Sequence, residues 1–186
     1  MLNLAYAALK SRLLQECAPQ YIDWYMGQYL EEEAADGGQV LWATPAMFIE
    51  FLPVQWQTLT GNIQVTDLAF NVHLVNDSVF DTDERILDST LNHLGQEGAI
   101  FRALMNWRAM LHDVPGMDTL EDTSADRVLL ESVVRNSTEP DHNLRRQLVS
   151  VQQFTARLYD YTATKQWVQV LTDLDLEVLR VLSLTP

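Results

Sequence analysis

The chain has 186 residues, with 12 Lys and Arg against 26 Asp and Glu, which gives a formal net charge of -14. A chain of this length folds most simply as one domain with its own core, and its negative field repels phosphate backbones and anionic lipid head groups, which argues against a basic nucleic-acid-binding or membrane-binding surface. The single cysteine, Cys17, excludes an internal disulfide, and no run of 18 apolar residues is present. We therefore expect a soluble protein of the cytoplasm.

The first 30 residues predict a helix and then a strand. Apolar residues recur every three or four positions from Leu2 to Leu13, which indicates an amphipathic helix over residues 2–17 that Pro19 ends. Residues 21–30 are rich in aromatic side chains and alternate with a period of two, which favours a strand. The side expected to face the helix carries Ile22, Trp24, Met26 and Leu30, and the opposite side carries Tyr21, Tyr25 and Tyr29.

The stretch 42–77 predicts the centre of the fold. Leu68, Phe70, Val72 and Leu74 alternate with more polar residues, as expected for a half-buried strand. Burying all four side chains contributes roughly 6 to 12 kcal/mol, at about 1.5 to 3 kcal/mol each. Residues 47–51 predict a second strand and residues 58–62 carry a turn signal, so we expect two neighbouring antiparallel strands.

Helices are expected next. Asp81 and Glu84 form a capping signal, and apolar residues follow at helical spacing up to Gly95 and again beyond Gly98. This pattern predicts a helix, a break and a second helix that ends at Pro115. The acidic residues 112–126 lack the regular spacing of a calcium loop, which favours a solvated loop over a metal site.

The last third of the chain predicts a hairpin. Residues 128–135 and 148–161 have strand character, and the polar residues 136–141 predict the turn between them. Residues 167–182 fit a helix or a strand, and we favour a final strand. The fold class is therefore α+β, a mainly antiparallel sheet with helices packed on one face, an N-terminal helix and a helix-break-helix crossover. We expect one domain over 1–186, with a core at 1–162 and a C-terminal extension at 163–186.

The sequence contains no recognisable catalytic motif. Residues His73, His93, His112 and His142 do not share metal-ligand spacing, and the seven glycines form no phosphate-binding loop. We predict no catalytic residue, no cofactor, no metal, and a protein that is not an enzyme. Glu50 is the one carboxylate inside an apolar strand. Its simplest interpretation is an outward-facing strand residue, and the alternative is a buried polar partner or a place in an interface.

The sequence of the central stretch, together with Gln28, resembles a known family. The residues on which the resemblance rests are Gln28, residues 45–51, Gln55 and Trp56, Gly61, Gln64 and residues 71–75. Over residues 20–110 the chain resembles prophage proteins that look like tail terminator, or tail completion, proteins of tailed bacteriophages. The resemblance implies a small α+β subunit that forms a ring, usually a homohexamer, at the head-proximal end of the tail tube, ends tube polymerisation and joins the tail to the neck.

The resemblance also implies partners and a location. The partners are further copies of the chain and the tail tube and neck proteins, DNA passes through the lumen without specific binding, and the protein belongs to the virion after assembly in the host cytoplasm. One alternative is a head-completion adaptor or stopper of the neck. A second alternative is a small enzyme or regulatory binding domain without a legible motif.

Two expectations concern the ring. Tyrosine is enriched at protein interfaces, so we expect Tyr21, Tyr25 and Tyr29, together with Glu50, at a subunit contact. The rival interpretation is that a second helix or the C-terminal segment covers the tyrosines within one subunit. The acidic segments 31–36 and 113–126 are expected in a lumen along which DNA slides, or else serve solubility alone.

Overall fold

The computed structural model describes residues 1–30, 42–77, 83–115, 127–141 and 147–163, and only the backbone at 83–88 and 141. Helix α1 (Leu2–Cys17) and helix α3 (Asp83–Leu104) lie against a long, curled sheet. A short 3-10 turn, η1 (Leu111–Asp113), follows α3. The α+β class predicted from the sequence is confirmed.

The sheet of the described residues is mainly antiparallel. The strands follow the spatial order β1 (Tyr21–Trp24), β2 (Ala46–Phe51), β4 (Ile63–Asp77), β7 (Gln147–Asp160), β6 (Val128–Asp141) and β5 (Ala109–Met110). Only the pair β1 and β2 is parallel among these neighbours. Strand β3 (Gln57–Thr60) pairs with the start of β4, while β7 pairs with β4 along almost its whole length. Strands β2 and β3 therefore share one edge of β4, and residues 52–56 connect them along that edge.

The core lies between the helices and one face of the sheet. Leu68, Phe70, Val72 and Leu74 of β4 are all fully buried, so the period-two prediction for this strand is confirmed. Helix α1 is also confirmed, with the bounds expected from the sequence. Its Arg12 donates a hydrogen bond of 3.0 Å from Nε to the carbonyl oxygen of Ala103 in α3, which joins the two helices.

The strand predicted over residues 21–30 is wrong beyond Trp24. After β1 the chain turns at Gly27, whose φ of 82° is in the left-handed region that glycine adopts without strain. The Gln28 side chain accepts a hydrogen bond from the Met26 backbone and donates one to the Trp24 carbonyl, both at 2.6 Å. Such local side-chain bonds replace a strand ladder. Met26 and Leu30, expected inside, are consequently 76% and 48% exposed.

The predicted helix-break-helix is also wrong, because α3 is continuous from Asp83 to Leu104 and contains Gly95 and Gly98. A glycine costs a helix interior about 1 kcal/mol relative to alanine, which packing against the sheet and α1 offsets. The helix ends well before Pro115. Asn106, with a φ of 57°, then turns the chain toward β6, where Asn106 and Trp107 exchange backbone hydrogen bonds with Val133. The capping residue Asp81 lies outside the described residues.

The C-terminal hairpin is confirmed as an antiparallel pair of β6 and β7, but its turn is not where the sequence placed it. Residues 136–141 continue β6 and pair with β7 as far as Asp141 and Val149. Pro140 is tolerated because the far side of β6 is a sheet edge over this stretch in the described part of the chain, so no ladder donor is needed there. The expected final strand at 167–182 lies outside the described residues, as do 31–36 and 116–126 of the acidic segments.

Candidate functional site

A partly buried polar cluster lies on the sheet face away from the helices. We call Tyr25, Tyr29, Glu50, Asn71 and His73 the tyrosine–histidine cluster. The Tyr29 hydroxyl is 2.8 Å from Nδ1 of His73, and these two residues are only 2% and 4% exposed. Nε2 of His73 is 3.1 Å from Oε2 of Glu50, which also accepts a 2.7 Å hydrogen bond from Asn71. The Tyr25 ring stacks on the imidazole, with centroids 4.0 Å apart.

The hydrogen bonds define what this cluster can do. Glu50 can accept a hydrogen bond from Nε2–H of His73, and in that tautomer Nδ1 accepts a hydrogen bond from the Tyr29 hydroxyl. Hydroxyl, imidazole and carboxylate then stand in the order of a nucleophile, a base and an orienting group. The Tyr29 hydroxyl, however, is enclosed by its own chain and lines neither of the surface hollows described below. The arrangement suits fastening residues 25–30 to the sheet.

The residues predicted at a subunit contact are separated by this geometry. They do not form one row on a strand, because β1 ends at Trp24. Tyr21 donates to Asp23 at 2.9 Å and stacks with Trp42, whereas Tyr25 and Tyr29 belong to the tyrosine–histidine cluster. Tyr29 is buried within its own chain, against Phe48 and His73 of the sheet. The rival interpretation named a second helix or the C-terminal segment as the cover, and residues 164–186 lie outside the described residues. An interface role for Tyr21, Tyr25 and the half-exposed Glu50 stays a prediction.

His93 forms a second buried contact, between α3 and the sheet. Its Nδ1 lies 2.8 Å from Nδ2 of Asn76, and its Nε2 lies 3.1 Å from Oγ of Ser150 and 3.4 Å from Glu97. Burial lowers the pKa of His93, although the Glu97 carboxylate acts in the opposite direction. The imidazole thus helps to position α3 over β4 and β7. No group of three His, Cys, Asp or Glu side chains that could hold a metal ion occurs within the described ranges.

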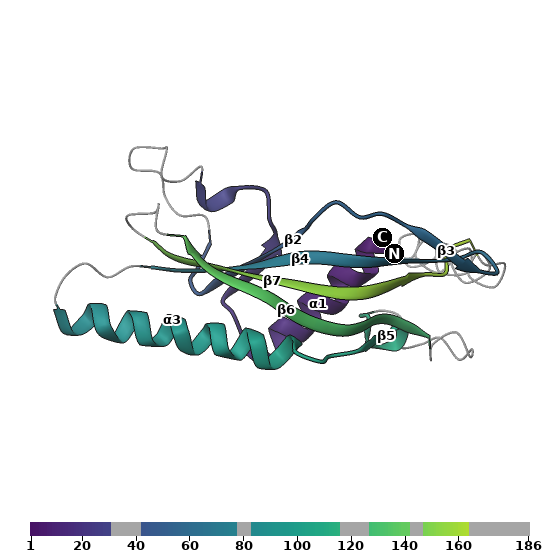
Figure 1. The fold of residues 1–186 in the computed structure, drawn as a ribbon. Helices are drawn as coiled ribbons and strands as arrows, with labels where there is room; N and C mark the ends of the chain where they lie inside the picture. Colours follow the sequence, from purple (N-terminus) through teal and green to yellow (C-terminus); the bar gives the residue numbers. More distant parts are fainter. Residues whose placement is uncertain (31–41, 78–82, 116–126, 142–146, 164–186) are drawn as a thin grey trace, which may run out of the picture.

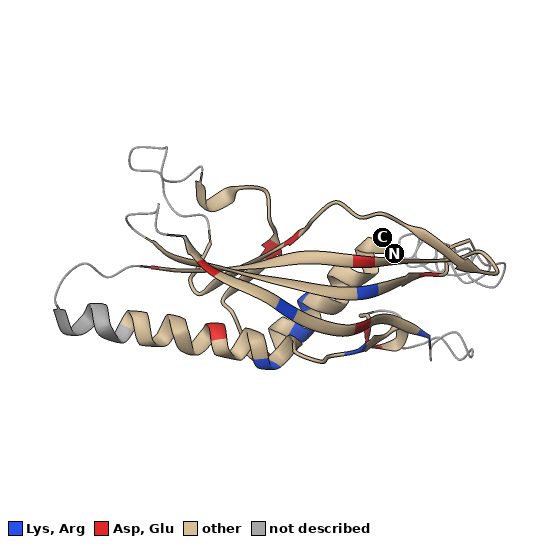
Figure 2. Cartoon of the chain, viewed as in Figure 1, with Lys and Arg blue, Asp and Glu red and all other residues tan. Residues whose placement is uncertain are grey.

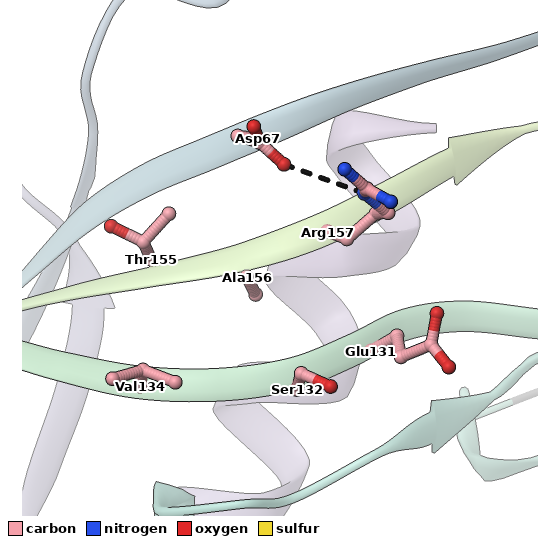
Figure 3. A pocket seen from close by; sticks show the side chains of 7 residues that line it. All are labelled: Asp67, Glu131, Ser132, Val134, Thr155, Ala156 and Arg157. Carbon is pink, nitrogen blue, oxygen red and sulfur yellow. Dashed lines mark ion pairs between the residues drawn. The ribbon is translucent and has the colours of Figure 1, made fainter.

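A shallow hollow of about 390 Å³ lies over β4, β7 and β6 (Figure 3). Arg157 on the middle strand pairs with Asp67 of β4 at 3.5 Å, and Glu131 of β6 accepts a 2.8 Å hydrogen bond from Tyr159. Ser132, with a φ of 56°, marks an irregularity where β6 shifts its register against β7. Because Asp67 and Arg157 are 70% and 55% exposed, their ion pair is screened by water and contributes little stability.

An apolar groove of about 490 Å³ opens beside the start of α1, and we call it the Trp24 groove. Its lining residues are Leu2, Asn3, Tyr6, Trp24, Phe51, Leu52, Pro53 and Val54. The ring of Trp24, 36% exposed, meets Tyr6 and Phe51 edge to face with centroids 5.5 Å and 5.0 Å away. Tyr6 is held by a 3.2 Å hydrogen bond to Asp23, and burial together with that carboxylate raises the pKa of Tyr6 to about 12.

The groove was missed at the sequence level because Trp24 was expected to face the core. It exists because residues 52–56 link β2 to β3 as an irregular connection, so that Pro53 and Val54 form one wall. Cys17 lies at the other end of α1, where burial raises the pKa of its thiol to about 11. A thiol that stays protonated at neutral pH is a poor nucleophile, which suits a structural helix residue.

Comparison with known proteins adds no relative: neither the protein-family models nor the curated proteins include a match to this chain. Within the described residues, the helices are too short or too polar to cross a lipid bilayer.

Proposed function

We propose that this chain is a structural subunit of a bacteriophage tail, which forms a ring at the head-proximal end of the tail tube, stops tube growth and joins the tail to the neck. The resemblance of residues 20–110 to tail terminator proteins motivates the proposal. The α+β fold is compatible with it. The main observation in its support is the Trp24 groove, an exposed apolar surface on a chain with a net charge of -14, which suits contact with another protein.

The proposed partners are further copies of the chain, the tail tube and the neck, in the virion and in the host cytoplasm during assembly. DNA crosses the ring without being held, because a chain with a net charge of -14 does not release counterions from phosphates. Binding of a fluorescent DNA duplex tests this at about 150 mM salt, where no retention is expected. Tight binding would rule out a passive lumen.

Removal of the gene from the phage or prophage that encodes it tests the proposal. Tubes that no longer stop growing are expected, seen by electron microscopy as overlong tails beside unattached heads, and a plasmid copy should restore normal particles. Tails of normal length beside unattached heads would instead assign the chain to the neck as an adaptor or stopper. Normal particles in the absence of the gene would exclude a structural role and favour an enzyme or a regulatory domain.

A further inference from the structure

The hairpin of β3 and β4 presents an apolar side chain to solvent. Its strands are joined by Gly61 and Asn62, both with positive φ, as in the tight turns that hairpins favour. Leu59 stands where the pairing of β3 with β4 shifts its register between Thr58 and Thr60. An irregularity of this kind re-aims a side chain, and Leu59 is 60% exposed. The hairpin lies at one end of the sheet (Figure 1).

Charge distinguishes this hairpin from the rest of the chain. Residues 51–66 form a run of 16 positions without Asp, Glu, Lys, Arg or His, in a sequence of which 20% is charged. Figure 2 shows the hairpin free of charged positions. The residues that line the Trp24 groove are uncharged as well. The chain therefore carries an exposed apolar projection and an apolar recess, both without charge.

These two surfaces fit a particular occupant. Two copies with a net charge of -14 each repel one another, so they associate most easily where neither surface carries charge. A recess of about 490 Å³ is within the range of roughly 300–1,000 Å³ of pockets that take up small ligands, so it can receive the tip of a side chain. Leu59 is exposed and is not among the residues that line the groove of its own chain.

We propose that the β3–β4 hairpin of one copy inserts Leu59 into the Trp24 groove of the next copy. The contact joins two different surfaces, so it repeats around a closed ring or along a filament. The inference rests on the proposed ring and names the surfaces that build it. The aromatic wall of Tyr6, Trp24 and Phe51 supplies the kind of rigid apolar contact that dominates interface energetics.

The first experiment measures the oligomeric state of the full chain by light scattering and sedimentation over a range of concentrations. Leu59→Asp is expected to raise the dissociation constant at least about 30-fold, as for a residue at the centre of an interface. Leu91→Asp is the matched control, because Leu91 is an equally exposed leucine, at 57%, on helix α3. It should associate like the wild type. Circular dichroism and thermal unfolding check that each variant folds.

The second experiment uses a groove variant, Asn3→Asp with Pro53→Asp, which puts charge into the recess at two exposed positions. An acid in the first turn of α1 favours the helix, so the variant should fold. Alone it should stay monomeric. Mixed with Leu59→Asp, it should form a 1:1 pair and nothing larger, because one intact hairpin meets one intact groove.

Several results would overturn the contact: a wild-type chain that stays monomeric, a Leu59→Asp chain that still assembles, or a mixture that yields no pair. A groove variant that unfolds early while the wild type is monomeric would mean that the chain's own residues fill the groove. The gene-removal experiment is separate. If rings assemble through Leu59 but removal of the gene leaves tail length unchanged, the proposed function is contradicted and the contact is not. If tails terminate normally with Leu59→Asp, the contact is contradicted and the proposed function is not.

Discussion

The hydroxyl of Tyr29 lies 2.8 Å from Nδ1 of His73, 44 positions further along the chain. This bond connects a segment that has left the sheet to the outer face of β4. The Tyr29 ring packs beside Phe48, at 6.2 Å between centroids, in a small core separate from the one under the helices. The sheet therefore buries side chains on both faces near β2, and Tyr29 anchors residues 25–30 to its outer face.

Tyr29→Phe tests this anchor. The variant keeps the ring but leaves Nδ1 of His73 without its tyrosine donor, and losing one partner of a buried hydrogen bond costs about 1 to 3 kcal/mol. In a chain of this size the melting temperature should fall by roughly 2 to 4 °C for each kcal/mol. Tyr21→Phe is the control: its hydroxyl donates to the carboxylate of Asp23, two positions along the chain, so the loss of stability should be smaller. Equal effects of the two variants would contradict an anchoring role.

A double-mutant cycle tests whether Tyr29 and Glu50 act through the same imidazole. Tyr29→Phe and Glu50→Ala each remove one partner of His73, so their effects on the free energy of unfolding should not add, with a coupling of about 0.5 to 3 kcal/mol. Chemical denaturation measures it. Tyr29→Phe combined with Gly95→Ala, on a helix across the sheet, should be additive within about 0.5 kcal/mol. Additivity in both pairs would mean that the cluster is not one network.

The parts of the fold that local pattern determines were predictable. Leu68, Phe70, Val72 and Leu74 alternate because one face of β4 is buried, and that period is visible in the residues themselves. The end of β1 was not visible, because it depends on two hydrogen bonds of the Gln28 amide. The continuity of α3 through Gly95 depends on tertiary packing, which outweighs the intrinsic helix propensity.

The candidate site, too, was predictable only where local sequence pattern determines it. Glu50 was identified as the one carboxylate inside an apolar strand, with an outward-facing residue as the simpler interpretation and a polar partner as the alternative. The sequence gives no sign that the partner is His73 or that Tyr29 completes the contact. Those residues meet only through the pairing of β2 with β4 and the turn at Gly27. The Trp24 groove likewise requires knowledge of how residues 52–56 run between β2 and β3. Pro53 was the one local sign of that irregularity.

Two identical substitutions should have opposite effects on stability. Gly61 has a φ of 56°, so Gly61→Ala forces a side chain into the left-handed region and should cost about 1 kcal/mol. Gly95 is inside α3, so Gly95→Ala should stabilise the chain by up to about 1 kcal/mol. An added Cβ would meet no atom within 4 Å at either site, so the contrast reports backbone conformation alone. Denaturant midpoints measure it, and equal signs would contradict the turn.

Stability should depend on pH through His93. Its pKa is lowered in the folded chain, chiefly by burial, whereas in the unfolded chain it is near the ordinary value of about 6.5. Protons therefore bind the unfolded chain more readily, and the stability that the neutral imidazole contributes is complete above about pH 6.5 and is lost as the pH falls through the lowered pKa. His93→Gln should be less stable than the wild type at pH 8 and should lose less stability between pH 8 and pH 5.

The control for this prediction is Gln96→Ala. Gln96 accepts a 2.7 Å hydrogen bond from Asn76, the residue that also contacts His93, but it carries no titratable group. Its replacement should lower the free energy of unfolding by about the same amount at pH 8 and at pH 5, because the proton uptake of His93 is unchanged. Urea denaturation at several pH values measures both variants. A His93→Gln chain whose stability falls as steeply with pH as the wild type would place the titrating group elsewhere in the protein.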